Sequence, residues 1–191
     1  MIFRIGSSGQ SMMAVLAGSV RITVPSPQGK EIVLADIEAG QVFGEIALLD
    51  GKERTADAVA LTSCELLVLE RRDLLPFIRE HPEVSQKLLE VLCDRLRRAD
   101  EHLTEIAFLE VPVRLAKALL RATSDPASSG TAQRSTKLSL SQRELANMIG
   151  GARESVNRCL RQWQDRGVIR LDKGWIYILS RDALKEIADP R

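Results

Sequence analysis

Long apolar runs and paired cysteines are both absent from this sequence. No stretch of 18 apolar residues occurs in the 191-residue chain, so no membrane-spanning helix is expected. The first residues, beginning at Met1, lack the build of a signal peptide. Cys64, Cys93 and Cys159 are odd in number and far apart, which argues against a disulfide framework and a CxxC metal site. We therefore expect a soluble cytoplasmic protein without a metal.

An excess of one charge is also missing, since the formal net charge is +1. Its distribution is uneven, however. Residues 1–81 carry 8 basic and 11 acidic side chains, a net of −3, whereas residues 137–191 carry 11 and 7, a net of +4. Apolar residues make up 45% of the chain, which is enough to build a core in one large or two small domains. The basic C-terminal part suits a module that binds a polyanion.

The most regular pattern lies in residues 82–110, where apolar residues recur three and four positions apart. This spacing predicts a heptad seam along one long helix, with Pro82 marking its start and Pro112 a stop or kink just beyond it. Such a seam, flanked by charges, favours a contact between two subunits. The alternative is a core helix inside one globule. The predicted interface residues are Leu89, Leu92, Leu96, Ala99, Leu103 and Ile106.

Short strands are predicted before the long helix. Valine and isoleucine alternate with polar residues over residues 20–24, the pattern of a half-buried strand, and residues 66–69 suggest a short buried one. Seven of the 12 glycines precede position 52 at spacings typical of turns, one of them at Gly29. We expect a small antiparallel roll or barrel, followed by a short helix capped by Asp73.

A helix-turn-helix pattern occupies the C-terminal part. Residues 113–122 have helical spacing and are followed by a polar loop at residues 124–136. Ser141 and Glu144 predict a capping box that starts a helix. That helix should end at Gly150, where a turn of positive φ is needed.

A second helix and a hairpin complete this pattern. The helix, from about residue 152 to 166, should bury Val156, Leu160 and Trp163 and expose a basic face, and residues 168–179 should form the hairpin. Two helices joined by a glycine turn, with a polar second helix, are typical of a DNA-binding unit with an added wing. The alternative is a helical hairpin with a solvated charged face.

Residues 43–56 combine a glycine-led turn, a carboxylate and an arginine in an otherwise apolar setting. Backbone N–H groups near Gly44 are able to meet phosphate oxygens, and Arg54 is able to bind a phosphate through two parallel hydrogen bonds. Glu45 is an acceptor suited to a sugar hydroxyl. A buried ion pair between Glu45 and Arg54 explains the same residues equally well, and the residues alone do not decide between the two interpretations.

The segment G-E-I-A-L-L, followed by R-T-A, resembles the phosphate-binding cassette of cyclic-nucleotide-binding domains. Residues 107–109 and 114–116 resemble the hinge of the cyclic-AMP receptor protein family of transcription regulators, and residues 150–158 resemble its recognition helix. The resemblance covers nearly the whole chain. It implies an α+β protein with an antiparallel β-roll cyclic-nucleotide-binding domain at residues 1–81, a dimerisation helix at 82–110 and a winged helix-turn-helix domain at 111–191.

The resemblance also implies a function, that of a homodimeric, cyclic-nucleotide-responsive transcription regulator and not an enzyme. Its ligand would be cyclic AMP, with cyclic GMP as a competitor. Ligand binding would reposition the recognition helices on a palindromic DNA site with TGTGA-type half-sites, and RNA polymerase would be a further partner. The residues that would bind the nucleotide are Gly44, Glu45, Ile46, Ala47, Arg54, Thr55, Arg95, Ala99 and Asp100. Those that would contact DNA are Ser141, Gln142, Arg143, Arg153, Glu154, Ser155 and Arg158.

Three departures from the family pattern bear on these expectations. The leading helix and first strand are missing, which implies a truncated product or a misassigned start. Ala99 and Asp100 stand where the best-known member has threonine and serine, which leaves the preferred base open. No N-terminal cysteine cluster is present, which argues against the oxygen-sensing iron–sulfur branch. A regulator of the same fold that needs no ligand is the main rival, and a cyclic-nucleotide-gated enzyme or channel subunit is the rival of another class.

Overall fold

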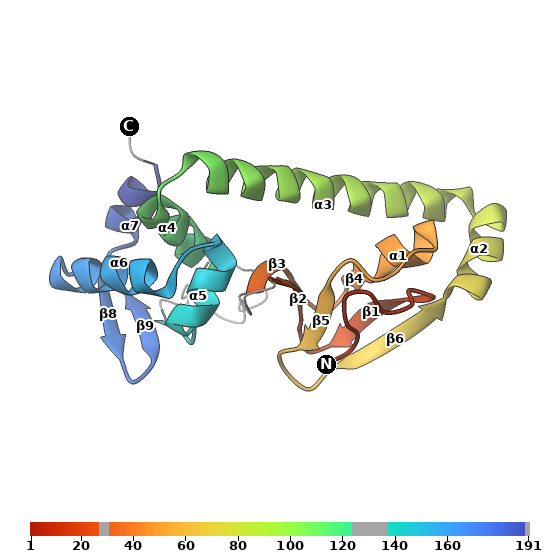
Figure 1. The fold of residues 1–191 in the computed structure, drawn as a ribbon, viewed down its shortest axis with the longest axis horizontal. Coiled ribbons are helices and arrows are strands. Elements are labelled where there is room, and N and C mark those ends of the chain that lie inside the picture. The colour runs from red at the N-terminus through yellow and green to blue at the C-terminus, as the bar shows by residue number, and fades with distance from the viewer. Residues whose placement is uncertain (27–30, 124–136, 190–191) are drawn as a thin grey trace. The chain divides into compact units, whose positions relative to one another are not determined.

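The structure, a computed structural model, describes residues 1–26, 31–123 and 137–189 (Figure 1). By its internal contacts the chain divides into two compact units, Met1–Asp100 and Glu101–Arg191. Both contain helices and antiparallel strands, so the predicted α+β class is confirmed. Gly29 and the predicted polar loop at residues 124–136 lie outside the described residues.

The first unit is built on two antiparallel sheets of three strands each, as expected for a small roll. Their strand orders are β4-β1-β6 and β3-β2-β5. The strands are β1 (Ser11–Ala17), β2 (Val20–Pro25), β3 (Glu31–Ile37), β4 (Val42–Phe43), β5 (Asp57–Ala60) and β6 (Glu65–Glu70). Apolar side chains of the strands form one buried cluster of Val15, Val20, Ile37, Phe43 and Ala58. A smaller cluster joins Met12 and Leu48 to Leu74.

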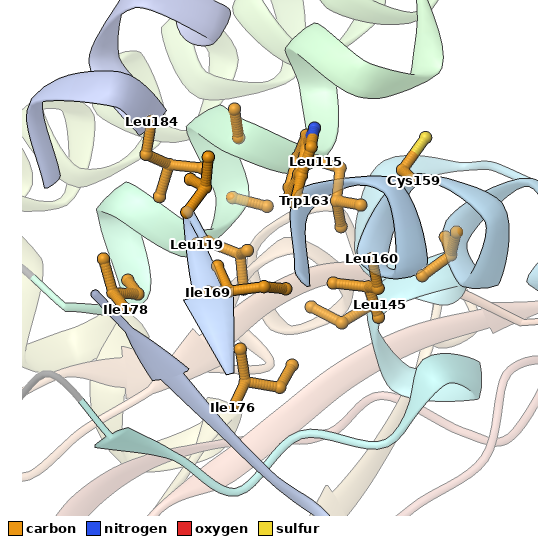
Figure 2. Close-up of a cluster of buried hydrophobic side chains, with 14 of the residues drawn as sticks. Leu115, Leu119, Leu145, Cys159, Leu160, Trp163, Ile169, Ile176, Ile178 and Leu184 are labelled. Carbon is orange, nitrogen blue, oxygen red and sulfur yellow. The ribbon is translucent and has the colours of Figure 1, made fainter. Parts of the chain in front are cut away.

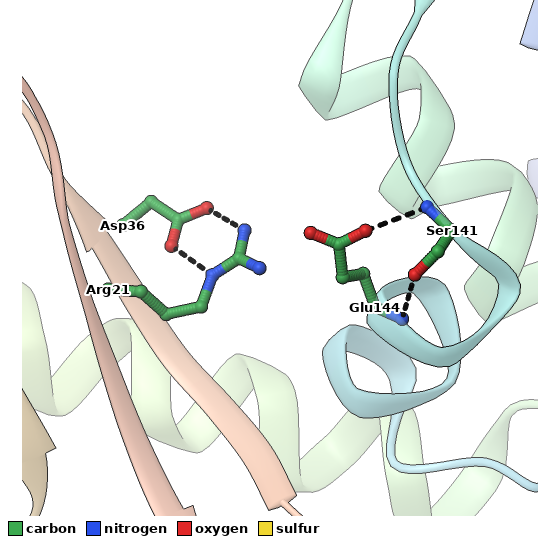
Figure 3. A network of polar contacts seen from close by, with 4 residues as sticks. All are labelled: Arg21, Asp36, Ser141 and Glu144. Atoms are coloured by element: carbon green, nitrogen blue, oxygen red, sulfur yellow. Dashed lines mark hydrogen bonds and ion pairs between the residues drawn. The ribbon is translucent and has the colours of Figure 1, made fainter. Parts of the chain in front are cut away.

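The strand predicted at residues 20–24 is present as β2, but its burial does not alternate cleanly. Val20 is fully buried, yet Thr23 is buried too and Val24 is not. The pairing of β2 with β3 shifts in register between Ile22 and Thr23, and such an irregularity interrupts the alternation of faces. On the same pair of strands, Arg21 and Asp36 form a two-pronged ion pair with both N–O distances at 2.7 Å (Figure 3).

Two other predictions for this unit are wrong in detail. The strand at residues 66–69 exists within β6, but it is not buried, because the described residues leave Leu67 and Val68 uncovered, at 59% and 55% exposure. The short helix α2 (Arg71–Glu80) has Glu70 as its N-cap, so Asp73 lies in its first turn and does not cap it. A carboxylate there still interacts favourably with the helix dipole.

The long helix α3 (Pro82–Phe108) follows α2, and it ends two residues before the predicted limit. The next helix, α4 (Val111–Ala122), begins with Pro112 in its first turn, where a proline costs no helical hydrogen bond. None of the 27 residues of α3 is buried. A helix this exposed, with leucines along one stripe, has an apolar face that its own chain leaves open.

The second unit packs around one continuous apolar core (Figure 2). Its elements after α4 are β7 (Lys137–Leu138), α5 (Gln142–Ile149), α6 (Arg153–Asp165), β8 (Ile169–Asp172), β9 (Trp175–Ile178) and α7 (Arg181–Ala188). The core includes Leu115, Leu119, Leu145, Leu160, Trp163, Ile169, Ile176, Ile178 and Leu184. The predicted burial of Val156, Leu160 and Trp163 is confirmed.

The helix-turn-helix has the local geometry that the sequence predicts. Ser141 Oγ accepts a hydrogen bond from the Glu144 N–H, and the Glu144 carboxylate accepts one from the Ser141 N–H, which makes the capping box (Figure 3). Gly150 ends α5 at φ 59°, the left-handed conformation expected of it. The hairpin turn consists of Lys173 and Gly174, both with positive φ, as in a type I′ turn. β7, which adds a third strand beside β9, and α7 were not predicted.

Candidate functional site

The predicted cassette folds as a glycine turn followed by the short helix α1 (Glu45–Asp50). Gly44 has φ 81°, and a Cβ at this position would lie 2.6 Å from Arg54 Nη1. Only glycine therefore allows the chain to turn here with the guanidinium so close. Arg54 Nη1 donates to the Gly44 carbonyl at 2.7 Å, and Arg54 Nη2 donates to Ser11 Oγ at 3.1 Å.

Arg54 is a buried cation whose hydrogen-bond partners among the described residues are neutral. It is 5% exposed, its guanidinium carbon lies 4.2 Å from the centre of the Phe3 ring, and its Nε has no hydrogen-bond partner. Burial lowers the pKa of Arg54 from its ordinary value, and the negative charge of Glu45 acts in the opposite direction. Buried charges in proteins are usually paired, so this guanidinium is a strong candidate for binding an anion.

Glu45 forms an ion pair with Arg95 of α3. The described residues contain no ion pair between Glu45 and Arg54, so the alternative of a direct pair between these two residues is wrong. Glu45 Oε1 lies 2.5 Å from Arg95 Nη1, and Arg95 also donates to the Val42 carbonyl. The Glu45 side chain is fully buried and its Oε2 lacks a hydrogen-bond partner. Arg95 thus joins the cassette to the long helix, and one carboxylate oxygen is left to accept a further hydrogen bond.

The other predicted nucleotide-binding residues differ in their exposure. Ala47 is 2% exposed, whereas Ile46 is 41% exposed. Thr55, Ala99 and Asp100 are exposed. The structure therefore brings Gly44, Glu45, Arg54 and Arg95 into one contiguous set of contacts, and it places Thr55 next to that set along the chain. Neither Ala99 nor Asp100 forms a hydrogen bond or an ion pair with this set in the described residues. An ion pair of Asp100 with Arg97 is likewise absent from that part of the chain.

The heptad seam of α3 is open to solvent in the single chain. Leu89, Leu96 and Leu103 are 62%, 63% and 65% exposed. Leu92 is half-buried and Ala99 exposed. Ile106, at 38%, is partly covered, and its Cδ1 would lie 3.1 Å from a Cβ placed on Gly150. The seam thus offers an apolar stripe to a partner, except that Ile106 also packs against the helix-turn-helix turn.

Sequence reasoning missed how the hinge region is braced within the second unit. Glu105 accepts hydrogen bonds from Arg121 Nη1 and Nη2 at 2.9 and 3.2 Å, and Lys117 Nζ lies 3.7 Å away. Burial raises the pKa of Glu105, but Arg121 and Lys117 outweigh it and lower that pKa overall. Arg114, itself buried, donates to the Ile149 carbonyl at 2.6 Å. The end of α3 is therefore tied to α4, and α4 to the end of α5.

The predicted DNA-contacting residues lie at the start of α5 and along α6. Ser141, Arg143, Arg153, Glu154 and Arg158 are exposed, while Gln142 and Ser155 are half-buried. The apolar side of α6 faces the core through Val156, Leu160 and Trp163. The polar side of α6 is therefore presented outward, as a recognition helix requires.

The wing adds basic and aromatic residues that sequence reasoning did not assign to a site. Lys137 Nζ lies 3.7 Å from the centre of the Trp175 ring, and the Arg170 guanidinium lies 4.5 Å from the centre of the Tyr177 ring. Trp175 also lines a hollow of about 540 Å³ that includes Arg143 and Arg153. Alternation of outward residues along the hairpin could have identified this face, but β7, which supplies Lys137, is too short to recognise in a sequence.

Two kinds of feature are absent from the described residues. No helix there is both long enough and apolar enough to cross a membrane. No group of three or more histidine, cysteine or acidic residues in that part of the chain is arranged to hold a metal ion.

Comparisons with known proteins identify both halves of the chain. The profile of the cyclic nucleotide-binding domain matches residues 1–81, and that of the Crp-like helix-turn-helix domain matches residues 113–187. The "CRP-like cAMP-activated global transcriptional regulator" of Mycobacterium tuberculosis is 34% identical, over 96% of this chain and 82% of the relative. The "Cyclic AMP receptor protein" of Thermus thermophilus is 37% identical, over 98% of this chain and 83% of the relative.

A solved structure agrees with these relatives. A CRP-family transcriptional regulator from Thermus thermophilus superposes with a TM-score of 0.81 at 27% identity, covering 98% of this chain and 92% of that one. The two matched domains stand in the order that the cassette and the helix-turn-helix have here. The chain, with its cyclic nucleotide-binding domain and its helix-turn-helix domain, belongs to the CRP family of transcription regulators.

Proposed function

We propose that this protein is a homodimer that binds a cyclic nucleotide in the first unit and, in response, binds a palindromic DNA site through the second. The observation that carries the nucleotide part is Arg54, a buried guanidinium beside the Gly44 turn with no carboxylate partner in the described part of the chain. A cyclic phosphate supplies the missing negative charge, and a contact between two opposite charges is stronger than the hydrogen bonds to neutral acceptors that Arg54 makes otherwise.

The contacts of the cassette support distinct roles for its members. Arg54 and Thr55, with Gly44, Ala47 and the backbone near them, would hold the phosphate. The unpartnered Oε2 of Glu45 would accept the ribose 2′-hydroxyl, while Oε1 remains on Arg95. Buried polar atoms without a partner are rare, and a ligand that donates to Glu45 and accepts from Arg54 satisfies both at once.

Cyclic AMP is the first candidate ligand, because the similar regulators named above are described as cAMP-activated or as cyclic AMP receptors. Cyclic GMP is the competitor. An ionised carboxylate only accepts hydrogen bonds, and guanine offers N1–H and its N2 amine together, whereas adenine offers only its N6 amine. The exposed Asp100, next to the seam residue Ala99, would make this distinction if it meets the base.

On DNA, the exposed start of α6 would enter the major groove. Arginine pairs well with guanine O6 and N7 and glutamate with cytosine N4, which suits Arg153, Arg158 and Glu154. Ser141, Gln142, Arg143 and Ser155 would position the duplex through phosphates. In a symmetric dimer two such helices reach successive major grooves about 34 Å apart, hence a palindromic site. The resemblance to the family, and not this geometry, suggests TGTGA-type half-sites. RNA polymerase would then be recruited or blocked at the promoter.

The decisive test is isothermal titration of the purified protein with cyclic AMP and with cyclic GMP, followed by gel shifts on a palindromic site with and without each nucleotide. We expect heat of binding for at least one nucleotide and tighter DNA binding in its presence. Equal DNA affinity with and without nucleotide, together with no heat of binding, would favour the ligand-independent regulator of the same fold. Absence of any sequence-specific shift would contradict the DNA-binding part.

A further inference from the structure

We propose that Arg95 is shared between Glu45 of its own chain and Asp100 of a second copy, so that one guanidinium joins the nucleotide cassette to the dimer seam. This inference rests on the homodimer of the proposed function and adds to it a residue from the partner copy. The starting observation is that Arg95 already bridges α3 and the cassette through Glu45 and Val42.

Arg95 has donors to spare and is accessible from outside. A guanidinium carries five N–H donors, and only two of them are used in the contacts with Glu45 and Val42 among the described residues. The Arg95 side chain remains 31% exposed although its partner Glu45 is fully buried. A second acceptor is therefore able to approach Arg95 from the solvent side without displacing Glu45.

The heptad register determines which residue of a second copy comes near. With Leu89, Leu96 and Leu103 at the a positions, Arg95 occupies a g position and Asp100 the next e position. In a parallel two-stranded coiled coil, a g residue faces the e residue five positions further along the other helix, and such pairs set partner choice and orientation. Arg95 of one copy then faces Asp100 of the other, and the two-fold symmetry gives the contact twice.

This pair is specific to one arrangement of the seam. The neighbouring g–e combinations are Leu88 with Cys93 and His102 with Ala107, and neither joins a fixed cation to an anion. In an antiparallel arrangement g faces g and e faces e, which brings no such opposite charges together. Asp100 is exposed and makes no ion pair with the described residues of its own chain. The charge complementarity of Arg95 and Asp100 therefore favours a second copy, in parallel orientation, as the occupant of the seam.

The same pair cannot form within one helix. Side chains three or four positions apart are neighbours on a helix, but residues five apart point to different sides. A direct ion pair between positions 95 and 100 must therefore form between two chains. A carboxylate has about four lone-pair sites, so pairing with Arg95 still leaves Asp100 able to accept from a base.

The test is a double-mutant cycle on dimer dissociation, measured by analytical ultracentrifugation of the full chain at low salt. Asp100→Arg should raise the dimer dissociation constant about 30-fold, because two attractions become two repulsions of the size typical for exposed pairs. The control Asp94→Arg makes the same charge change at an exposed f position and should raise the dimer dissociation constant less than about threefold. In an Arg95→Gln background, Asp100→Arg should also raise the dimer dissociation constant less than about threefold. Asp100→Asn is the milder variant to use if Asp100→Arg impairs folding.

Raising the salt to about 0.5 M should remove most of the difference between Asp100→Arg and Asp94→Arg. Equal effects of Asp100→Arg and Asp94→Arg, or an undiminished effect of Asp100→Arg in the Arg95→Gln background, would overturn this inference. Those results would leave the homodimer itself intact, provided that Leu96→Glu still yields monomers. A dimer that survives Leu96→Glu would instead contradict the proposed seam.

Discussion

The two units of this protein differ in the burial of the charged residues proposed for their binding sites. In the first unit Arg54 and Glu45 are buried, and the apolar core is divided into two small clusters. In the second unit one continuous core holds the helices and the wing, and Arg153, Glu154 and Arg158 lie outside it. A ligand of the first unit should therefore alter its stability, whereas the α6 residues proposed to contact DNA should be replaceable without affecting the fold.

The helix α3 belongs to neither pattern, since it exposes apolar residues. Its seam residues Leu89, Leu96 and Leu103 are more than half exposed, and an apolar stripe of this length is typical of a surface that another helix covers. The helix α3 is thus a third region with its own surface, and we propose that a second copy of the chain covers it.

The largest effect is expected from Leu96→Glu, which places a charge against its own copy on the seam. An unpaired, desolvated carboxylate should dissociate the dimer. DNA affinity should then fall by about 10²–10⁴, since two half-sites no longer bind together. Sedimentation and gel shifts measure the two consequences. Glu90→Gln, outside the seam, is the matched control, and a persistent dimer in the double variant with Leu103→Glu would place the interface elsewhere.

Arg54→Leu should abolish nucleotide binding in the first unit, with a loss of about 3 kcal/mol or more, because the phosphate loses the buried counter-charge of Arg54. With nucleotide present at about 100 times its Kd, the free energy of unfolding of the wild type should rise by about 2.7 kcal/mol. The nucleotide should not stabilise the variant, and thermal unfolding measures the difference. Arg72→Leu, at a side chain that is 79% exposed, should behave as the wild type. Wild-type affinity of the Arg54 variant in calorimetry would contradict this phosphate site.

Arg153→Ala tests the opposite behaviour of the second unit. It should cost about 1–3 kcal/mol of DNA binding and relax the preference at one base pair only, while the melting temperature stays unchanged. Selection from random DNA reports the preference, with Arg161→Ala near the end of α6 as the control. A loss of stability, or a selected site without two-fold symmetry, would argue against the assignment.

Ser141→Ala should lower the free energy of unfolding of the second unit by about 1 kcal/mol, because the Glu144 N–H loses its cap. Ser139→Ala, also exposed but outside the capping box, should have little effect. Denaturant unfolding of both variants measures the difference. If the two variants are equally stable, the capping box contributes nothing in solution.

The smallest effect is expected from Asp100→Ser, which bears on ligand choice in the first unit. If Asp100 meets the base, the variant should shift the ratio of the affinities for cyclic AMP and cyclic GMP by about tenfold or less, since one hydrogen bond to a charged group is exchanged. Titration of both nucleotides against wild type and variant gives this ratio. An unchanged ratio would show that Asp100 has no role in base choice.

Local features of the fold were predictable from the sequence. The capping box at Ser141, the positive φ of Gly150 and the long helix with its exposed seam depend on residues near one another in the chain. The cassette motif identified Gly44, Glu45 and Arg54 as a group. Short elements such as β7 and α1 could not be predicted, because segments of two to six residues carry too little periodicity.

Pairing between distant residues was decided only by the tertiary structure. The sequence left open whether Glu45 binds Arg54, and the fold answers that Glu45 binds Arg95, which lies 50 positions away on α3. Likewise the exposure of Leu67 and Val68 on β6 depends on how much of the fold covers them, and the bracing of Glu105 by Arg121 follows from how α4 packs. Composition and periodicity determine which helices and strands form and which residues they carry. Which charges pair depends on the distances between them, and for residues far apart in the chain only the packed tertiary structure sets those distances.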